Sequence, residues 1–328
     1  MNKITLIATL SFGLEAVVKR ELQALGFHDL RVSDGKVEFD ATPEDIPTLN
    51  LWLRSADRVL LKMGEFEAKD FDTLYEETYA IPWDHWIHED GKFTVNGVSV
   101  KSQLESVPAC QSIVKKAIAE KLGEEYDTEW LSESGAEFPV KVSIRKDVAT
   151  LTLDTSGTGL TRRGYRNQAG VAPIKETLAA ALVQLSFWNK DRLLIDPMCG
   201  SGTILIEAAM IGRNIAPGLK RSFASEDWEQ IPSAAWEQAR GHARSVIKSD
   251  VEMQLFGYDK DEEMLYASKS NAKAAGVGKA IQFEQKDVRD LWIDQEHGIM
   301  ISNFPYGVKM GDYRELNQLY ISFNKTFK

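Results

Sequence analysis

The chain is poor in cysteine, and this scarcity excludes several kinds of protein. Its 328 residues include two cysteines, Cys110 and Cys199, which are too few for a disulfide framework or a zinc cluster. The five histidines show no ligand spacing with acids or cysteines, so we expect no metal. No apolar run is long enough to span a membrane, and residues 1–13 lack the features of a signal peptide. We therefore expect a cytoplasmic protein with no membrane partner.

Positive charge is also in short supply, because the formal net charge is −10. This balance argues against a surface coated with basic residues for nucleic acid. If RNA binds, it must bind through local groups of cations. The candidates lie on a predicted helix, at a predicted hairpin and in the stretch RRGYR, and they are Lys115, Lys116, Lys121, Arg145, Lys146, Arg162, Arg163 and Arg166. The alternative for each group is a solvated face of the fold.

What the chain does have is a strand, a glycine-rich turn and a helix in residues 193–203, LLIDPMCGSGT. The apolar residues 193–195 predict a buried parallel strand, and Gly200 and Gly202 allow a tight turn that leaves room for a ligand. Such a unit forms the ligand-binding crevice of a doubly wound sheet. A dinucleotide site is not favoured, because Leu205 stands where the third glycine belongs. The turn is not a phosphate-binding P-loop, because no lysine follows the second glycine.

This stretch resembles motif I of S-adenosylmethionine-dependent methyltransferases. The resemblance implies S-adenosylmethionine as cofactor, with its methionine end held by Asp196 and the turn. It also implies that Asp259, at the end of the next strand, binds the ribose and that Asp287, at the end of the third, binds the adenine amine. The implied cofactor-binding residues are Asp196, Pro197, Cys199, Gly200, Ser201, Gly202, Thr203, Asp259, Asp287 and Asn303. The alternatives are a helix cap for the last two aspartates and a nucleophile for Cys199, which we expect instead to be a packing residue.

After this motif, apolar strands alternate with helices, which predicts an α/β fold with a parallel, Rossmann-like sheet. The expected elements are strands over residues 253–259, 281–287 and 299–302 and helices over 261–275 and 313–327. Residues 212–248 are expected to be mostly helical, with Trp228 and Trp236 packed inside. A complete methyltransferase sheet continues with another strand, a helix and a strand pair, roughly 50 residues by ordinary element lengths. We therefore expect this sheet to lack its last strands.

The fourth of these strands ends in SNFPY, which resembles motif IV of amino-group methyltransferases. An exocyclic amine on a base is a poor nucleophile, because its lone pair is delocalised into the ring. The Asn303 side-chain oxygen and the carbonyl of Phe304 or Pro305 can accept its N–H groups and aim the lone pair at the methyl group. Tyr306 offers a ring on which the target base stacks. Asn303, Phe304, Pro305 and Tyr306 are therefore the predicted catalytic residues.

Residues 1–155 predict two α+β units. The elements expected in the first are a strand over 3–10, a helix over 14–25, a hairpin over 30–39 and a helix over 43–63. Those expected in the second are a helix over 71–79, a strand over 92–100, a helix over 112–122 and a hairpin over 138–153. In the strand over 92–100, Phe93, Val95 and Val98 are expected to face the core.

The stretch FTVNGVSVKSQLESVPACQSIVKKAIAEKL resembles the core of a THUMP domain. Residues 154–177 resemble the join in THUMP-containing guanine-N2 methyltransferases of large-subunit ribosomal RNA, and the resemblance continues to the end of the chain. It implies a ferredoxin-like unit (1–65), a THUMP RNA-binding domain (66–155), a connecting helix segment (156–190) and a methyltransferase domain (191–328). The helix over 112–122 is the element expected to face RNA.

The resulting hypothesis is a methyltransferase that acts on guanine N2 of 23S ribosomal RNA, free or in a large-subunit precursor. Phe304 departs from the usual N-P-P-Y of this family, and ribosomal RNA adenine dimethylases carry an apolar residue there. An adenine-N6 enzyme therefore remains an alternative, as does a transfer-RNA guanine-N2 enzyme. The alternative from another class is a non-catalytic RNA-binding scaffold with a degenerate methyltransferase fold.

Overall fold

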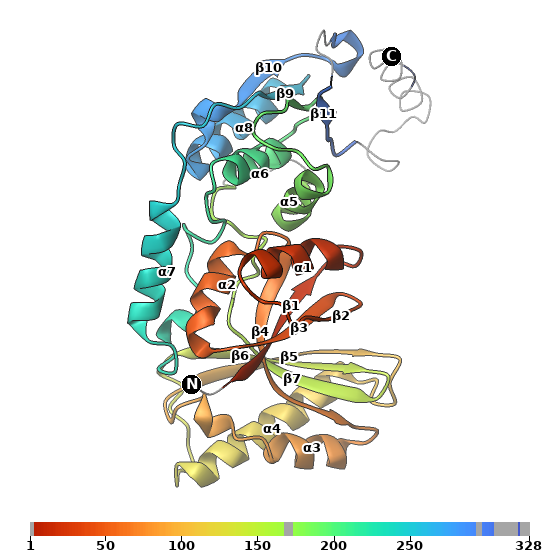
Figure 1. Ribbon diagram of the computed structural model, residues 1–328. Coiled ribbons are helices and arrows are strands. Elements are labelled where there is room, and N and C mark those ends of the chain that lie inside the picture. Colours follow the sequence, from red (N-terminus) through yellow and green to blue (C-terminus); the bar gives the residue numbers. More distant parts are fainter. Residues whose placement is uncertain (1–2, 167–172, 293–296, 305–320, 322–328) are drawn as a thin grey trace. The chain divides into compact units, whose positions relative to one another are not determined.

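The computed structural model describes residues 3–166, 173–292, 297–304 and 321 (Figure 1). The chain forms two compact units. The N-terminal unit comprises Met1–Leu160 and Ser222–Gly241, and the C-terminal unit comprises Thr161–Arg221 and His242–Lys328. No helix among the described residues has both the length and the hydropathy to cross a bilayer.

The N-terminal unit is built on one seven-stranded sheet with the strand order β2-β3-β1-β4-β7-β6-β5. Its strands are β1 (Ile4–Leu10), β2 (Arg31–Ser33), β3 (Lys36–Ala41), β4 (Ala56–Glu67), β5 (Lys92–Val100), β6 (Glu137–Arg145) and β7 (Val148–Asp154). Strand β4 pairs antiparallel with β1 on one side and with β7 on the other. The two predicted α+β units therefore share a single continuous sheet.

The helices of this unit lie beside the two halves of the sheet (Figure 1). They are α1 (Glu15–Ala24), α2 (Ile46–Trp52), α3 (Phe71–Tyr79) and α4 (Val107–Glu125), with 3-10 turns η1 (Pro43–Asp45) and η2 (Trp83–His85). Helix α4 begins earlier than predicted, because Ser106 caps it by accepting the backbone N–H of Ala109. Val98 was expected to face the core but is 39% exposed, because it lies on the opposite face of β5 from the buried Phe93.

The predicted helix over residues 43–63 is wrong beyond Trp52, where α2 ends and the chain turns into β4. The side chain of Glu21, on α1, accepts the backbone N–H groups of Arg54 and Ser55 at 2.9 and 3.2 Å. These N–H groups are therefore satisfied outside the helix. The apolar run that follows enters the middle of the sheet, and a short buried run of this kind has no periodicity that separates strand from helix.

Residues 222–241 lie within the segment predicted to be the methyltransferase domain, and they pack on the N-terminal unit. They include the 3-10 turn η3 (Ala224–Asp227) and most of α7 (Ser233–Ser245). The Trp228 ring stacks on Phe138 at 5.0 Å, and its indole N–H donates to the Glu137 carbonyl at 2.9 Å. Trp228 and Trp236 are 1% and 5% exposed, so the prediction that both are packing residues is confirmed.

In the part of the C-terminal unit that the structure describes, four parallel strands form a sheet with the order β10-β9-β8-β11. Its elements are β8 (Leu194–Asp196), β9 (Leu255–Asp259), β10 (Gln282–Gln285), β11 (Ile299–Met300), α5 (Glu176–Leu185), α6 (Thr203–Gly212), α8 (Glu262–Ala275), η4 (Gly278–Ala280) and η5 (Val288–Asp290). The order reverses at β8, because β9 and β10 continue to one side and β11 lies on the other. Ligands of such sheets bind beyond the carboxyl ends of the strands at this switch point. The predicted helix over 313–327 lies outside the described residues.

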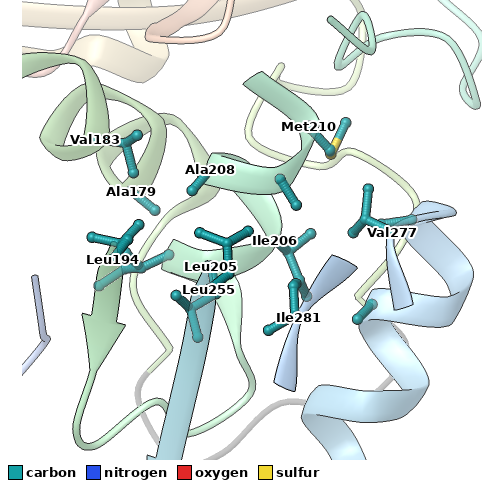
Figure 2. Packing of buried hydrophobic residues seen from close by; sticks show 14 of the residues in the cluster. Ala179, Val183, Leu194, Leu205, Ile206, Ala208, Met210, Leu255, Val277 and Ile281 are labelled. Carbon is teal, nitrogen blue, oxygen red and sulfur yellow. The ribbon is translucent and has the colours of Figure 1, made fainter. Parts of the chain in front are cut away.

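Helix α6 lies at the centre of the C-terminal core, where Leu205 and Ile206 reach toward the strands (Figure 2). Every residue from 203 to 210 is buried. A helix that is buried all round must have neighbours on every side. Here α5 contributes Ala179 and Val183, and the sheet contributes residues such as Leu255. The start of α6, which carries the glycine-rich turn, is therefore held in a rigid setting.

A buried polar network ties α2 to the end of β7 in the N-terminal unit. The Asn50 amide donates to Ile46 O at 3.1 Å and to Thr155 Oγ1 at 2.9 Å, and its oxygen accepts the Ser156 hydroxyl at 2.6 Å. The hydroxyls of Thr155 and Ser156 in turn bond the backbone of Val59. Asn50 is fully buried, so each of these bonds is shielded from water.

Asn50→Ala is expected to lower the free energy of unfolding of the N-terminal unit by about 2–4 kcal/mol, because each buried polar group left without a partner costs about 1–3 kcal/mol. Urea unfolding of the full chain, followed by hydrogen exchange in α2 and β7, measures this loss. Asn96→Ala is the matched control, because Asn96 is exposed on β5. Equal losses in the two variants would show that the network contributes nothing.

Candidate active site

The carboxylate that ends β8 is buried at the switch point of the sheet. Asp196 is 1% exposed, and its Oδ1 accepts the Ser302 hydroxyl at 2.6 Å and the Met198 N–H at 3.3 Å. Burial raises the pKa of Asp196 to about 7, and the charge of Asp259 adds to the rise. Both of these donors are uncharged, so a positively charged ligand group beside this carboxylate would favour its ionised form.

The two glycines of the turn do different things, although both have positive φ. A Cβ on Gly202 would come within 3.0 Å of Ser268 and 3.2 Å of Phe283, so this glycine allows α6 to pack against its neighbours. A Cβ on Gly200 would have no heavy atom within 4 Å, so the space beside this residue is open. The prediction that the turn leaves room for a ligand therefore agrees with the open space beside Gly200.

The carboxylate that ends β9 closes the other side of the turn. Asp259 Oδ2 accepts the N–H of Gly200 at 2.9 Å, and its Oδ1 accepts the N–H of Asp261 at 3.0 Å. The parallel pairing of β8 with β9 brings the ends of these strands to one edge. The structure thus brings Asp196, Gly200 and Asp259 together, as predicted for one binding site.

Asp287 follows β10 and caps the 3-10 turn η5 by accepting the N–H of Arg289 at 2.9 Å. The Arg289 guanidinium also bonds the carboxylate and holds the pKa of Asp287 below its ordinary value. The capping alternative is therefore what the structure shows directly. Its role toward an adenine amine stays a prediction.

Motif IV follows β11, which pairs parallel with β8. Ser302 lies between this strand and Asn303, and its bond to Asp196 ties the start of motif IV to the end of β8. Asn303 is exposed and Phe304 is half-buried. Pro305 and Tyr306, the other two predicted catalytic residues, lie outside the described residues.

The remaining members of the turn are buried and serve its packing. Pro197, Ser201 and Thr203 are buried, and Cys199 belongs to the hydrophobic core. Burial raises the pKa of the Cys199 thiol well above its ordinary value, and the carboxylates of Asp196 and Asp259 raise it further. A thiol in this setting stays protonated and is a weak nucleophile, which agrees with the expected packing role. Among the described residues, no group of three or more acids, histidines or cysteines could hold a metal ion.

Two of the predicted RNA-binding arginines pair with buried acids of the C-terminal unit; the burial of Arg163 argues against a contact with RNA, whereas that role of Arg166 stays a prediction. The Arg163 side chain is 1% exposed and lies 3.5 Å from the buried carboxylate of Glu207, which also accepts the Tyr165 hydroxyl at 2.9 Å. Arg166 pairs with Glu176 at 3.3 Å, and its side chain is 16% exposed. The cluster of arginines in RRGYR predicted an exposed basic patch. Arg163 and Arg166 instead pair with acids that are buried and lie elsewhere in the sequence. Arg162 is exposed.

Of the predicted lysines of α4, Lys115 and Lys116 are exposed and Lys121 is half-buried, and each already has an acidic partner. The pairs are Lys115 with Glu133, Lys116 with Glu120 and Lys121 with Glu125. The positive charge of this helix face is therefore largely balanced within the unit. An RNA contact through these lysines stays a prediction.

The cations at the β6–β7 turn are different, because Arg145 and Lys146 are exposed and have no acidic partner in the part of the chain that the structure describes. Lys101 joins them: β5 and β6 are parallel, and the N–H of Lys146 donates to Val100 O at 3.2 Å. Asp147 locks this corner by accepting the N–H of Gln103 at 2.7 Å. We call Lys101, Arg145 and Lys146 the basic corner.

Sequence reasoning missed Ser302, Lys101 and Glu207. Ser302 stands next to Asn303, so its place before motif IV was a usable signal for a contact with the neighbouring strand end. Lys101 joins the basic corner only because β5 pairs with β6, and no local pattern specified that pairing. Glu207 looks like an ordinary helix residue until the packing of α6 is known.

Comparison with known families agrees with this geometry. A model described as "RMKL-like, methyltransferase domain" matches residues 163–328. Models of an RlmL ferredoxin-like domain and of a THUMP domain match residues 5–60 and 68–154. The predicted order of a ferredoxin-like region, a THUMP region and a Rossmann-like methyltransferase is therefore confirmed.

Individual relatives carry the same order. The "Putative RNA methyltransferase YpsC" of Bacillus subtilis is 50% identical over 332 residues, which cover 100% of this chain and 86% of that protein. The ribosomal RNA large subunit methyltransferase K/L of Vibrio parahaemolyticus is 36% identical over 336 residues, which cover 98% of this chain but 46% of that protein. The chain thus spans less than half the length of this second relative.

One solved structure bears on the cofactor. The crystal structure of "SMU.472, a putative methyltransferase complexed with SAH" is 39% identical, has a TM-score of 0.94, and the match covers 100% of this chain and 87% of that one. The matches to all three models and the likeness along the whole chain lead to one conclusion: the chain belongs to the family of RMKL-like methyltransferases, with a ferredoxin-like and a THUMP domain before the catalytic domain.

Proposed function

We propose that this chain carries the activity of an S-adenosylmethionine-dependent RNA methyltransferase that acts on guanine N2 of 23S ribosomal RNA. The observation that carries the proposal is the Ser302–Asp196 hydrogen bond, which joins motif IV to the cofactor turn at the switch point. Motif IV, which would hold the target amine, and the turn that would hold the cofactor thus follow two adjacent strands, β11 and β8. A cytoplasmic location follows from such a substrate.

S-adenosylmethionine is the methyl donor of this family, and the site suits it. The buried Asp196 offers a carboxylate to the amino group of the methionine end, and the open side of Gly200 admits the ligand. Asp259 lies on the far side of the turn, where an acid can bind ribose hydroxyls. These residues would hold the cofactor, which supplies the methyl group when it is bound.

The chemistry requires positioning more than acid–base catalysis. The amine nitrogen forms a bond to the methyl carbon while the carbon–sulfur bond breaks, giving S-adenosylhomocysteine and an amine that then loses a proton to solvent. Asn303 is the first acceptor for the amine N–H groups, and its exposed side chain is free to meet a base. Holding the nitrogen against the methyl group supplies most of the acceleration, because the reactants are already aligned.

RNA as the substrate is supported by the THUMP match and by the names of the relatives, two of which are RNA or ribosomal RNA methyltransferases. Guanine N2 is supported by the resemblance of the join and of motif IV to those of guanine-N2 enzymes. Phe304 favours the second candidate, adenine N6, because an apolar residue stands there in adenine dimethylases. A transfer-RNA target is the third.

The first experiment incubates the protein with methyl-labelled S-adenosylmethionine and undermodified ribosomal RNA, followed by complete digestion. Labelled N2-methylguanosine is expected. Asn303→Ala should lower the rate at least about 100-fold with cofactor affinity nearly unchanged, because it removes an alignment made in the transition state. An equally severe loss of cofactor binding would instead make Asn303 a cofactor ligand, the other role that the resemblance implies. Labelled N6-methyladenosine would overturn the guanine assignment. In a parallel reaction with transfer RNA, label on transfer RNA but none on ribosomal RNA would overturn the ribosomal assignment.

Asp196→Asn is expected to raise the stability of the fold at neutral pH while it weakens cofactor binding. The folded protein keeps a proton on Asp196 up to about pH 7, whereas the unfolded chain releases it near the ordinary value of 3.8. The contribution of this group to stability is therefore full below pH 4 and is lost as the pH rises to 7. The variant escapes this loss, so its stability relative to wild type should rise by up to about 4 kcal/mol across that range, at about 1.4 kcal/mol per pKa unit.

The same variant should bind S-adenosylmethionine more weakly by about 1–3 kcal/mol, because it loses a charge-assisted hydrogen bond. Thermal unfolding at several pH values and calorimetric titration measure the two effects. Asp191→Asn, at an exposed carboxylate, is the control for both. A variant that binds the cofactor as tightly as wild type would remove Asp196 from the site.

Replacing Arg145 and Lys146 of the basic corner by glutamine should weaken RNA binding about 10-fold and reduce the slope of log K against log salt by about 0.7–0.9 per lost phosphate contact. Fluorescence anisotropy over a salt series measures both quantities. Lys115→Gln is the comparison, because Lys115 already pairs with Glu133 and should lose little. A larger loss for Lys115→Gln would make α4 the RNA-binding element.

A further inference from the structure

The arginine that ends RRGYR reaches into the cofactor turn. Arg166 Nη2 donates to Thr203 Oγ1 at 2.9 Å and to Ile174 O at 2.6 Å, and Nε lies 3.3 Å from Glu176 Oε1. One planar guanidinium thus binds the first residue of α6, the approach to α5 and the first residue of α5. Nη2 makes both hydrogen bonds and Nε faces the Glu176 carboxylate, and a lysine has no second nitrogen with which to occupy both positions.

Thr203 connects Arg166 to the glycine-rich turn. Its hydroxyl lies 3.3 Å from the Ser201 hydroxyl, and Ser201 is 7% exposed. The amide of Asn271, on α8, donates to the Ser201 carbonyl at 3.2 Å from the other side. Ser201 is therefore held through its side chain by the Arg166–Thr203 pair and through its backbone by Asn271, between two glycines that impose no conformation of their own.

The charge of Arg166 needs an explanation, because it sits beside the N-terminal ends of α5 and α6, where the helix dipoles disfavour a cation. Glu176 offsets this cost. Its carboxylate is 7% exposed, pairs with Arg166 and also accepts the Thr161 hydroxyl at 2.9 Å. Arg166 is held by Thr203 and Ile174, and Glu176 is held by Thr161. Such supporting contacts are typical of residues that fix the geometry of a neighbouring site.

From these contacts we infer that Arg166 is a positioning residue for the cofactor turn, acting through Thr203 on Ser201. The inference rests on the proposed use of S-adenosylmethionine at this turn. It gives the join a second role besides linking two regions, because the join sets the shape of the cofactor site. A turn shaped before the ligand arrives binds it more tightly, since less ordering remains to be done on binding.

Arg166→Lys tests this, because the lysine keeps a positive charge, but its single nitrogen cannot occupy both the Nη2 position beside Thr203 and Ile174 and the Nε position beside Glu176. The dissociation constant of S-adenosylmethionine, measured by calorimetry without RNA, should rise about 10-fold, the scale of a lost charge-assisted hydrogen bond. RNA affinity, measured by anisotropy, should be unchanged. A role in RNA binding would give the reverse pattern, as would be expected for the exposed Arg162 in Arg162→Gln.

A double-mutant cycle with Thr203→Val separates positioning from direct contact. If Arg166 acts through Thr203, then Thr203→Val should weaken cofactor binding as much as Arg166→Lys, and the double variant should be no worse. Additive losses would overturn the inference and make Arg166 a direct ligand. Equal cofactor affinity in wild type and Arg166→Lys would also overturn it. Failure of the wild type itself to bind the cofactor would instead refute the proposed function.

Discussion

The parallel pairing of β8 with a strand on each side is the constraint on which the active site depends. Strand β8 is three residues long, yet it pairs with β9 and β11 and sits where the strand order reverses. Because parallel strands end at the same edge, the acid that ends β8 lies beside the acid that ends β9 and the serine that follows β11. Asp196, Asp259 and Ser302 come from distant parts of the sequence and meet for this reason alone.

The buried charges of the C-terminal unit fall into two groups. Arg163 pairs with Glu207 and Arg166 with Glu176, so each buried cation has a carboxylate and helps fix the backbone around it. Asp196 accepts bonds from uncharged donors, and its pKa rises to about 7. A buried carboxylate of this kind is unfavourable without a ligand, and sites of this kind are typical of function.

The N-terminal unit shows that the units of structure differ from the segments of sequence. Strand β4 joins the ferredoxin-like and THUMP regions into one sheet, and residues 222–241 return to pack on that sheet from the middle of the catalytic segment. Trp228 anchors this returning segment against Phe138. The basic corner arises in the same way, because Lys101 and Lys146 become neighbours only when β5 and β6 pair.

By itself the sequence determined the strand–turn–helix of motif I, the alternation of strands and helices, and the packing role of Trp228, because local periodicity, glycine and residue size specify these features. It failed where the deciding partner is distant. Residues 56–63 form a strand because β1 and β7 pair with them, and Glu21 ends the helix before them. Arg163 is buried and Arg166 is half-buried, because they pair with the buried carboxylates of Glu207 and Glu176. The sequence around a charged side chain is the same whether that side chain faces water or a buried acid. Only the tertiary packing therefore decided which arginines form ion pairs inside the protein.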